Sequence, residues 1–217
     1  EAGEMVISPE APYERGCGIE ILRHSAESVD LTRLGDGRHP LLLGHDTEKQ
    51  IGVIDRAWID DKRQLRGAPR FSRSALAQEI KQDVQDKIRT LVSVGYFIEE
   101  IEEVKKDADG TYTVVRRLSG DDFEREQRAL HGESWNRAGP SAGRAQDSAP
   151  PTFVVTRWQP FEASIVPVPA DCGAGFGKSA GVDPEPVAAP AAPAPAASVI
   201  TAAPRILTEK KTMENPK

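Results

Sequence analysis

The segment Arg89-Thr90-Leu91-Val92-Ser93-Val94-Gly95-Tyr96 has the composition of a buried strand. Its apolar residues are mostly the β-branched and aromatic types that fit a packed, pleated surface. Ser93 interrupts this run and Gly95 follows it. Ser93 is either a strand serine bonded to a neighbouring carbonyl, or a nucleophile on a rigid element with Gly95 giving a substrate backbone room. The segment alone favours the first interpretation, because short motifs often match by chance.

A helix is predicted directly before this strand. Apolar residues recur at every fourth position from Leu76 to Ile88, which places them on one stripe of a helix. Ser72 or Ser74 can accept hydrogen bonds from the free amides of the first turn. This helix therefore leads the chain into the strand of Ser93.

Most of the remaining chain has the pattern of short strands. Apolar runs, some alternating with polar residues, are separated by turns rich in Gly, Pro and Asp. The predicted strands are 5–7, 16–22, 29–34, 40–46, 50–59, 65–71, 89–104, 111–118, 152–158 and 161–169. This pattern predicts a mainly β fold with one or few helices, a closed or nearly closed β-barrel.

Two interruptions and a change of composition set the expected domain organisation. Pro160 is expected to end a strand, and the polar, Gly-containing segment 119–150 is expected to be a mobile insertion. Residues 1–172 form the predicted domain. Residues 173–217 are expected to be a disordered linker and tail, because they contain a long Ala/Pro tract. A chain that begins with Glu1 is expected to be processed or a fragment of a longer protein.

The composition, 38% hydrophobic and 29% charged residues, is typical of a soluble globular protein. The net charge of −6 gives no basic footprint for nucleic acid. No run approaches the roughly 20 apolar residues of a membrane span, and no secretory segment follows the acidic N-terminus. Cys17 and Cys172 alone make no disulfide framework, which predicts a reducing compartment. No CxxC or HExxH spacing is present, so no metal and no cofactor are expected.

A serine nucleophile at neutral pH needs a base within hydrogen-bonding reach and usually a third group that orients the base. Among the four histidines, His45 is the best candidate, because an apolar strand fixes its backbone and Gly44 gives it room. His24 and His39 flank turns, and His131 lies in the polar insertion. A surface histidine at a strand end is the alternative interpretation of His45.

Glu162 is the candidate for the third group. It lies between Phe161 and Ala163 in an apolar strand, where an ionised carboxylate is costly unless it is paired. Arg157 is an alternative partner for this carboxylate. Asp46 is the second candidate for the third group, although adjacent strand residues point to opposite faces.

Other kinds of site are less well supported. Cys17 and Cys172 could be nucleophiles, but Cys172 is at the edge of the domain and Cys17 lies between two glycines. Residues 173–179 are superficially similar to a phosphate-binding loop. They lack its full spacing and precede a linker rather than a helix.

Several motifs over about residues 3–172 resemble those of the tailed-phage prohead serine proteases. In chain order they are Glu10-x-Pro12…Arg15-Gly16, Leu41-Leu42-Leu43-Gly44-His45-Asp46, Gln50-Ile51-Gly52-Val53, Leu65-Arg66-Gly67-x-x-Arg70-Phe71-Ser72, Asp83-Val84-Gln85-Asp86-Lys87-Ile88-Arg89, Val92-Ser93-Val94-Gly95-Tyr96 and Trp158-x-Pro160-x-Glu162-x-Ser164-x-Val166-x-Val168-Pro169-Ala170-Asp171.

That family is similar in fold to the herpesvirus capsid assembly protease. The resemblance implies a barrel of that kind with His45 as base, Ser93 as nucleophile and Glu162 as third member. The chain departs from the family at Thr90, where a small or amide-bearing residue is expected. Its segment 119–150 is also longer than expected.

The function that the resemblance implies is proteolysis inside an assembling capsid in the host cytoplasm. The enzyme would cut the scaffolding segment of the major capsid protein, and itself, before DNA is packaged. No nucleic-acid or membrane partner is expected, and a homo-oligomer is a further option.

Three roles are open for the Ala/Pro tract and the basic residues after it. They could form a tether to a scaffold-like segment, a region of self-cleavage, or the join to a fused capsid protein. Two alternatives to a serine protease also stay open: a non-catalytic capsid-assembly scaffold module with the same barrel, and a cysteine hydrolase that uses Cys17.

Overall fold

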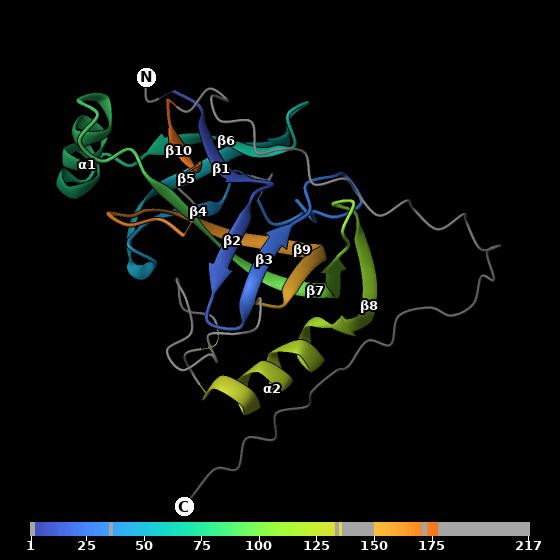
Figure 1. Ribbon diagram of the computed structural model, residues 1–217. Helices are drawn as coiled ribbons and strands as arrows, with labels where there is room; N and C mark the ends of the chain where they lie inside the picture. The colour runs from blue at the N-terminus through green and yellow to red at the C-terminus, as the bar shows by residue number, and fades with distance from the viewer. Residues whose placement is uncertain (1–2, 35–36, 133–134, 136–149, 171–172, 178–217) are drawn as a thin grey trace, which may run out of the picture.

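The computed structural model describes residues 3–34, 37–132, 135, 150–170 and 173–177 (Figure 1). These residues form one ten-stranded sheet and two helices. In chain order the elements are β1 (Met5–Pro9), β2 (Pro12–Arg15), β3 (Gly18–Leu22), β4 (His39–Leu43), β5 (Asp46–Ile59), β6 (Gln64–Phe71), α1 (Ala75–Gln85), β7 (Val92–Lys106), β8 (Tyr112–Ser119), α2 (Gly120–His131), β9 (Thr152–Ile165) and β10 (Gly175–Phe176).

Strand β9 organises the sheet. One edge of β9 pairs with β7 in antiparallel fashion along its whole length. The other edge is parallel to β3 at residues 152–155 and to β4 at residues 163–165. The sheet therefore divides at β9 into a short wing, β3–β2, and a long wing, β4–β5–β6–β1–β10. Strand β7 lies outside both wings, on the opposite edge of β9. Figure 1 shows α1 and α2 at opposite ends of the molecule.

The prediction of a mainly β fold with few helices is confirmed, but the predicted closed barrel is wrong. The path of paired strands is open, from β10 at one end to β2 at the other, with β7 and β8 branching from β9. Gly175 of β10 meets Leu91, just before β7, in a single isolated bridge. A two-residue strand cannot form the run of consecutive pairs that would close the sheet.

Helix α1 forms where the apolar spacing predicts it. Ser74 is the N-cap, and its hydroxyl accepts a hydrogen bond from the backbone of Ala77 at 3.3 Å. Ile80 and Val84 are buried against the sheet. Ile88 lies past the end of the helix and is 70% exposed, so the helix is shorter than the apolar stripe suggests.

Helix α2 occupies a segment that was expected to be a mobile insertion. Ser119 caps its first turn, which is acidic and therefore favourable at the positive end of the helix dipole. Phe123 is buried in the main core. The prediction is wrong for residues 120–131, because a cap and an aromatic anchor stabilise a helix whose other residues are mostly polar. Most of the remaining insertion lies outside the described residues.

The strand predicted at residues 29–34 is also absent. Val29 makes only an isolated bridge with Trp158, and the following residues form turns. The backbone of Leu34 donates to the carbonyl of Leu31 at 3.0 Å. The alternation of apolar and polar residues here therefore accompanies turns that bury Leu34, not a strand.

Strand β9 continues through Pro160, which was expected to end it. In the pairing with β7, Tyr96 faces Pro160 and the preceding Gly95 faces Glu162. Phe161 is therefore an extra residue on β9, a β-bulge. Bulges are among the few places where a strand tolerates proline, and they redirect the side chains beside them.

The main core is a contiguous cluster that includes residues of most strands and both helices. Trp158 of β9 is fully buried, and its indole N–H donates to the carbonyl of Arg23 at 2.7 Å.

Ala174 and Phe176 are also buried in this core, so packing extends past the predicted boundary at residue 172. The predicted tail stays a prediction, since residues 178–217 lie outside the described part of the chain.

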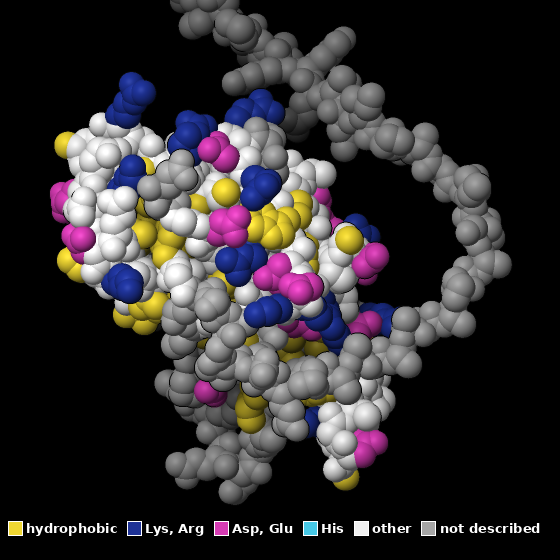
Figure 2. Space-filling model, turned by 90° about the horizontal axis from the view of Figure 1, so that it is seen from above, with side chains coloured by type: hydrophobic (Ala, Val, Ile, Leu, Met, Phe, Trp, Pro, Cys, Tyr) yellow, Lys and Arg dark blue, Asp and Glu magenta, His cyan; other side chains and the backbone are white. Residues whose placement is uncertain are grey.

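The surface carries both signs of charge. On the face seen in Figure 2, Lys and Arg side chains alternate with Asp and Glu around small hydrophobic patches. Exposed ion pairs, such as Arg70 with Asp55 at 2.9 Å, each contribute little to stability. Neither helix in the described part of the chain is long and apolar enough to cross a membrane.

Candidate active site

The pairing of β7 with β9 places four small or polar residues side by side. Ser93 faces Ser164, and Gly95 faces Glu162. Because residues directly opposite each other in a sheet share a face, both pairs point to the same side. The bulge at Phe161 lies directly before Glu162 and sets the direction of its side chain.

His45 lies in the two-residue turn between β4 and β5, not at the end of a strand as the sequence suggests. Leu43 pairs with Asp46, and the two residues between them have positive φ, 67° for Gly44 and 59° for His45. Turns with positive φ at both positions match the twist of a hairpin. The backbone of Gly44 donates to the carbonyl of Ile165 at 3.0 Å, which holds this turn beside the end of β9.

The structure brings His45 and Glu162 together. Nδ1 of His45 lies 2.7 Å from Oε1 of Glu162, whose side chain is 5% exposed. A carboxylate can only accept, so Nδ1 carries a proton, and in the neutral ring Nε2 is the acceptor. The hydrogen bond that His45 donates to Glu162 raises the pKa of His45; burial opposes this effect, and the charge of Glu162 adds to it.

The alternative partners of the sequence analysis are engaged elsewhere. Arg157 pairs with Glu99 at 3.0 Å and with Glu100 at 3.3 Å, not with Glu162. Asp46 pairs with Lys49 at 2.8 Å, where it faces solvent.

Ser93 and His45 line the same cleft, which has a volume of about 420 Å³. Ser93 is 8% exposed. The structure forms no hydrogen bond between the side chains of these two described residues. His45 therefore shares the cleft with Ser93 and is bonded to Glu162, which does not itself line the cleft. The catalytic roles of the three residues stay predictions.

Gly95 has a role that differs from the predicted one. A Cβ at this position would come closer to Oε1 of Glu162 than real Cβ atoms approach, and would lie 2.9 Å from Cε2 of Phe161. The missing side chain therefore makes room for the carboxylate of Glu162 rather than for a substrate backbone. His45 can reach Glu162 because position 95 is glycine.

Ser164 is a member of the site that the sequence analysis did not single out. It is fully buried, its hydroxyl donates to Oε2 of Glu162 at 2.7 Å, and it accepts from the backbone N–H of His45 at 3.0 Å. Two polar residues two positions apart in the otherwise apolar run 161–166 were the available signal. They share a face, and a buried polar pair requires partners.

A buried polar group forms part of the cleft wall. Arg15 donates from Nε to Glu20 at 2.7 Å and from Nη2 to the hydroxyl of Tyr96 at 2.6 Å, and this hydroxyl in turn donates to Glu20. Burial would lower the pKa of Arg15, but the nearby charge of Glu20 and the two tyrosines outweigh it and raise that pKa. Burial first, then the charge of Glu20, raises the pKa of Tyr96. The polar side chains of this wall therefore bind one another, and the charge of Glu20 balances that of Arg15.

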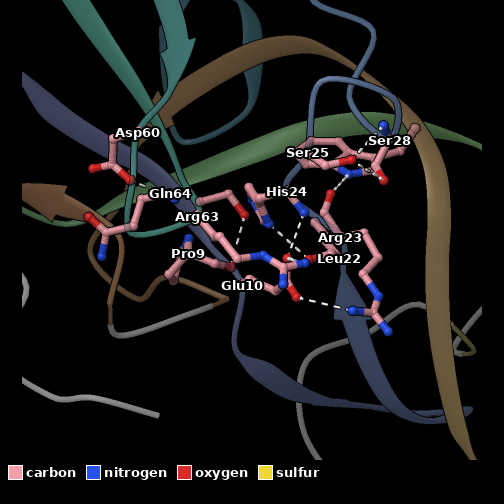
Figure 3. Close-up of polar contacts among 12 residues, drawn as sticks. Pro9, Glu10, Leu22, Arg23, His24, Ser25, Ser28, Asp60, Arg63 and Gln64 are labelled. Atoms are coloured by element: carbon pink, nitrogen blue, oxygen red, sulfur yellow. Dashed lines mark hydrogen bonds and ion pairs between the residues drawn. The ribbon is translucent and has the colours of Figure 1, made fainter. Parts of the chain in front are cut away.

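A second cluster supports the backbone of the wall near Pro9 (Figure 3). Glu10 accepts from the backbone of His24 at 2.7 Å and from Arg63 at 2.7 Å, and Arg23 lies 3.6 Å away. These contacts tie the β1–β2 link to the end of β3 and to the β5–β6 turn. Glu10 therefore anchors the segment that faces β7 across the cleft.

The other candidates in the described part of the chain do not line the cleft. His24 is 1% exposed, its Nε2 has no hydrogen-bond partner, and burial lowers its pKa to about 4. Cys17 is buried beside Trp135, and Cys172 lies outside the described residues. His39 lies in β4 and His131 in α2.

Residues 173–177 of the loop-like motif form β10 and its flanks, and the rest of that motif lies outside the described residues. In the described part of the chain, no group of His, Cys, Asp and Glu residues is arranged to hold a metal ion.

Comparison with known proteins identifies a similar phage protein. The chain is 36% identical over 178 residues to the major capsid protein of Halomonas phage phiHAP-1, which is 81% of this chain and 23% of that protein. The chain is therefore homologous to one part of a phage major capsid protein and spans less than a quarter of its length. No protein-family profile matches the chain, and no solved structure matches it.

Proposed function

We propose that this chain is a serine endopeptidase of phage procapsid maturation. The observation that carries the proposal is that His45 and Ser93, from separate segments, line one cleft, while Nδ1 of His45 lies 2.7 Å from the buried Glu162 behind it. A nucleophile, a base and a group that orients the base are the parts that acyl transfer by serine requires.

In the proposed mechanism, each residue has one task. Glu162 accepts a hydrogen bond from Nδ1–H of His45, fixes the ring tautomer and stabilises the imidazolium that forms during the reaction. Nε2 takes the proton of Ser93 as the Ser93 oxygen attacks the scissile carbonyl, and it then gives that proton to the leaving amine as the C–N bond breaks. Nε2 next takes a proton from water, which attacks the acyl-enzyme and releases Ser93 and the carboxylic acid product. The hydrogen bond from Ser93 to Nε2 is absent in this structure, and we expect it to form when a peptide fills the cleft.

The proposed substrates are the scaffolding segment of a major capsid protein and the chain itself, inside a procapsid in the host cytoplasm. The homology to part of a major capsid protein supports this setting. The matched region is 23% of that relative, so there it is continuous with a much longer polypeptide. This favours the third role considered for the C-terminal segment, the join to a fused capsid protein.

A second function, that of a non-catalytic capsid-assembly module, has support of its own. The side chains of Ser93 and His45 are not hydrogen-bonded, and the relative is named as a capsid protein rather than as a protease. The two functions differ in whether Ser93 reacts.

Reaction with a fluorophosphonate separates these two functions without knowledge of the cleavage site. We expect the wild-type chain to be labelled at Ser93, as located by mass spectrometry, and both Ser93→Ala and His45→Ala to lose the label while remaining folded. Ser28→Ala is a matched control, because the Ser28 hydroxyl bonds Ser25 outside the cleft. A wild-type chain that is unlabelled and leaves a co-expressed cognate capsid protein intact would establish the non-catalytic module.

A further inference from the structure

We propose that Ser164 is a positioning residue that holds both parts of the catalytic base, the carboxylate of Glu162 and the backbone of His45. The catalytic meaning of this role rests on the proposed function. The structural role, which is to fix the contact between His45 and Glu162, does not.

The direction of each hydrogen bond at Ser164 follows from the chemistry of its partners. A backbone N–H can only donate, so the Ser164 oxygen accepts from His45 N at 3.0 Å. An ionised carboxylate can only accept, so the single hydroxyl proton goes to Oε2 of Glu162 at 2.7 Å. One hydroxyl therefore connects two residues that lie 117 positions apart in the chain.

Both partners of Ser164 need this support. His45 has φ of 59°, in the left-handed region that side chains other than glycine seldom adopt, and its side chain is 45% exposed. Packing alone therefore does not hold the ring. Glu162 is 4% exposed, and its Oε2 would lose the donor that Ser164 provides. A buried oxygen without a donor favours a turn of the carboxylate away from His45.

Ser164 is not itself a candidate nucleophile. It is fully buried, it is not among the residues that line the cleft, and its proton is committed to Glu162. Ser93, directly opposite on β7, lines the cleft. The two facing serines therefore have different tasks, one to react and one to hold the base.

The test uses the full chain and two readouts. The pKa of His45 is measured by NMR titration of its ring nitrogens, and the rate of fluorophosphonate labelling is measured as a function of pH. For Ser164→Ala we expect the His45 pKa to fall toward its ordinary value and the plateau labelling rate to fall roughly tenfold or more, as expected for a misplaced base. Ser164→Thr, which keeps the hydroxyl, should retain the raised pKa, and Ser28→Ala should change neither readout.

A Ser164→Ala chain that keeps both the raised His45 pKa and the wild-type labelling rate would overturn the proposal, whatever its loss of thermal stability. If this variant does not fold, Ser164→Cys takes its place, because a thiol fills the same space and is a weak donor. If the wild-type chain is not labelled at all, the proposed function fails, while the His45 titration still decides whether Ser164 holds the pair.

Discussion

Two histidines in this molecule show how local surroundings separate a candidate base from a structural residue. His24 is buried in the core, and this burial lowers its pKa to about 4, so it is neutral at physiological pH. His45 is half exposed and bonded to Glu162, and this bond raises its pKa. Only His45 borders the cleft of Ser93, and only it combines access to solvent with a carboxylate partner.

The raised pKa of His45 predicts the pH dependence of labelling at Ser93. The base must be neutral to take a proton, so the labelling rate should rise with pH through the His45 pKa, above the ordinary value of about 6.5. Glu162→Gln removes the charge that favours the imidazolium. The pH at which labelling is half-maximal should therefore move down toward about 6.5, and the labelling rate at high pH should fall by a factor of roughly 10 to 10³.

The control for this prediction is Glu99→Gln, which removes a carboxylate of β7 that pairs with Arg157. This control should change neither the midpoint nor the plateau of the labelling rate as a function of pH. A Glu162→Gln profile with an unchanged midpoint would show that Glu162 does not act on the base.

Replacement of Gly95 tests the geometry of the pair from the opposite strand. In Gly95→Ala the added Cβ collides with Glu162 and Phe161, so the carboxylate must move away from His45. We expect the His45 pKa to fall toward its ordinary value and labelling to slow by roughly 10²-fold.

Gly3→Ala is the matched control, because nothing lies within 4 Å of its added Cβ. The far-UV circular dichroism of both variants should match that of the wild type. Wild-type labelling by Gly95→Ala would mean that the carboxylate can move without loss of function.

At the scale of elements, bulges and turns place the site more than the regular strands do. The bulge at Phe161 directs Glu162, and the turn between β4 and β5 carries His45. Helix α2 also depends on the close packing of its first residue, Gly120, against the backbone of Ile98 in β7. A Cβ at Gly120 would overlap the carbonyl oxygen of Ile98 and lie 2.6 Å from its carbonyl carbon.

Gly120→Ala should therefore displace α2 from β7. We expect the free energy of unfolding to fall by about 1–3 kcal/mol, since an added methyl group at a close-packed backbone contact forces the chain to shift. Urea denaturation measures the loss, and hydrogen exchange should show faster exchange in α2 than in α1. Equal exchange in the two helices would contradict a displacement confined to α2.

At the scale of the molecule, the open sheet is held together near the cleft by β10. Its two residues pair with β1, and the backbone of Phe176 donates to the carbonyl of Thr90 at 2.8 Å, just before β7. Phe176 is 7% exposed and belongs to the core. This segment lies beyond the domain boundary that the sequence suggests, yet it contacts both strands beside the cleft.

Phe176→Ala should lower the free energy of unfolding by about 3–5 kcal/mol, as is typical for removal of a buried aromatic ring. Chemical denaturation measures this change. Leu130→Ala, at a position that is 66% exposed, should change stability by less than about 0.5 kcal/mol. A loss in Phe176→Ala no larger than that in Leu130→Ala would show that β10 does not stabilise the fold.

The sequence predicted those features whose signals are local. The apolar periodicity of α1, the apolar run of β7 and the ordered motifs around His45, Ser93 and Glu162 are all readable within about ten residues. These signals led to a mainly β fold and to three residues that the structure brings together. They did not lead to α2, whose helical signal is weak apart from its cap and Phe123.

Contacts between distant segments decided the rest. The path of β9 through Pro160, the open sheet and the left-handed turn at His45 depend on which strands lie beside each other. Gly95 makes room for Glu162, and Ser164 binds both Glu162 and the backbone of His45, only because β4, β7 and β9 adjoin. A hydrogen bond or a close contact needs both of its partners. In this site most partners lie more than 60 positions apart in the chain, so the residues next to one partner do not identify the other.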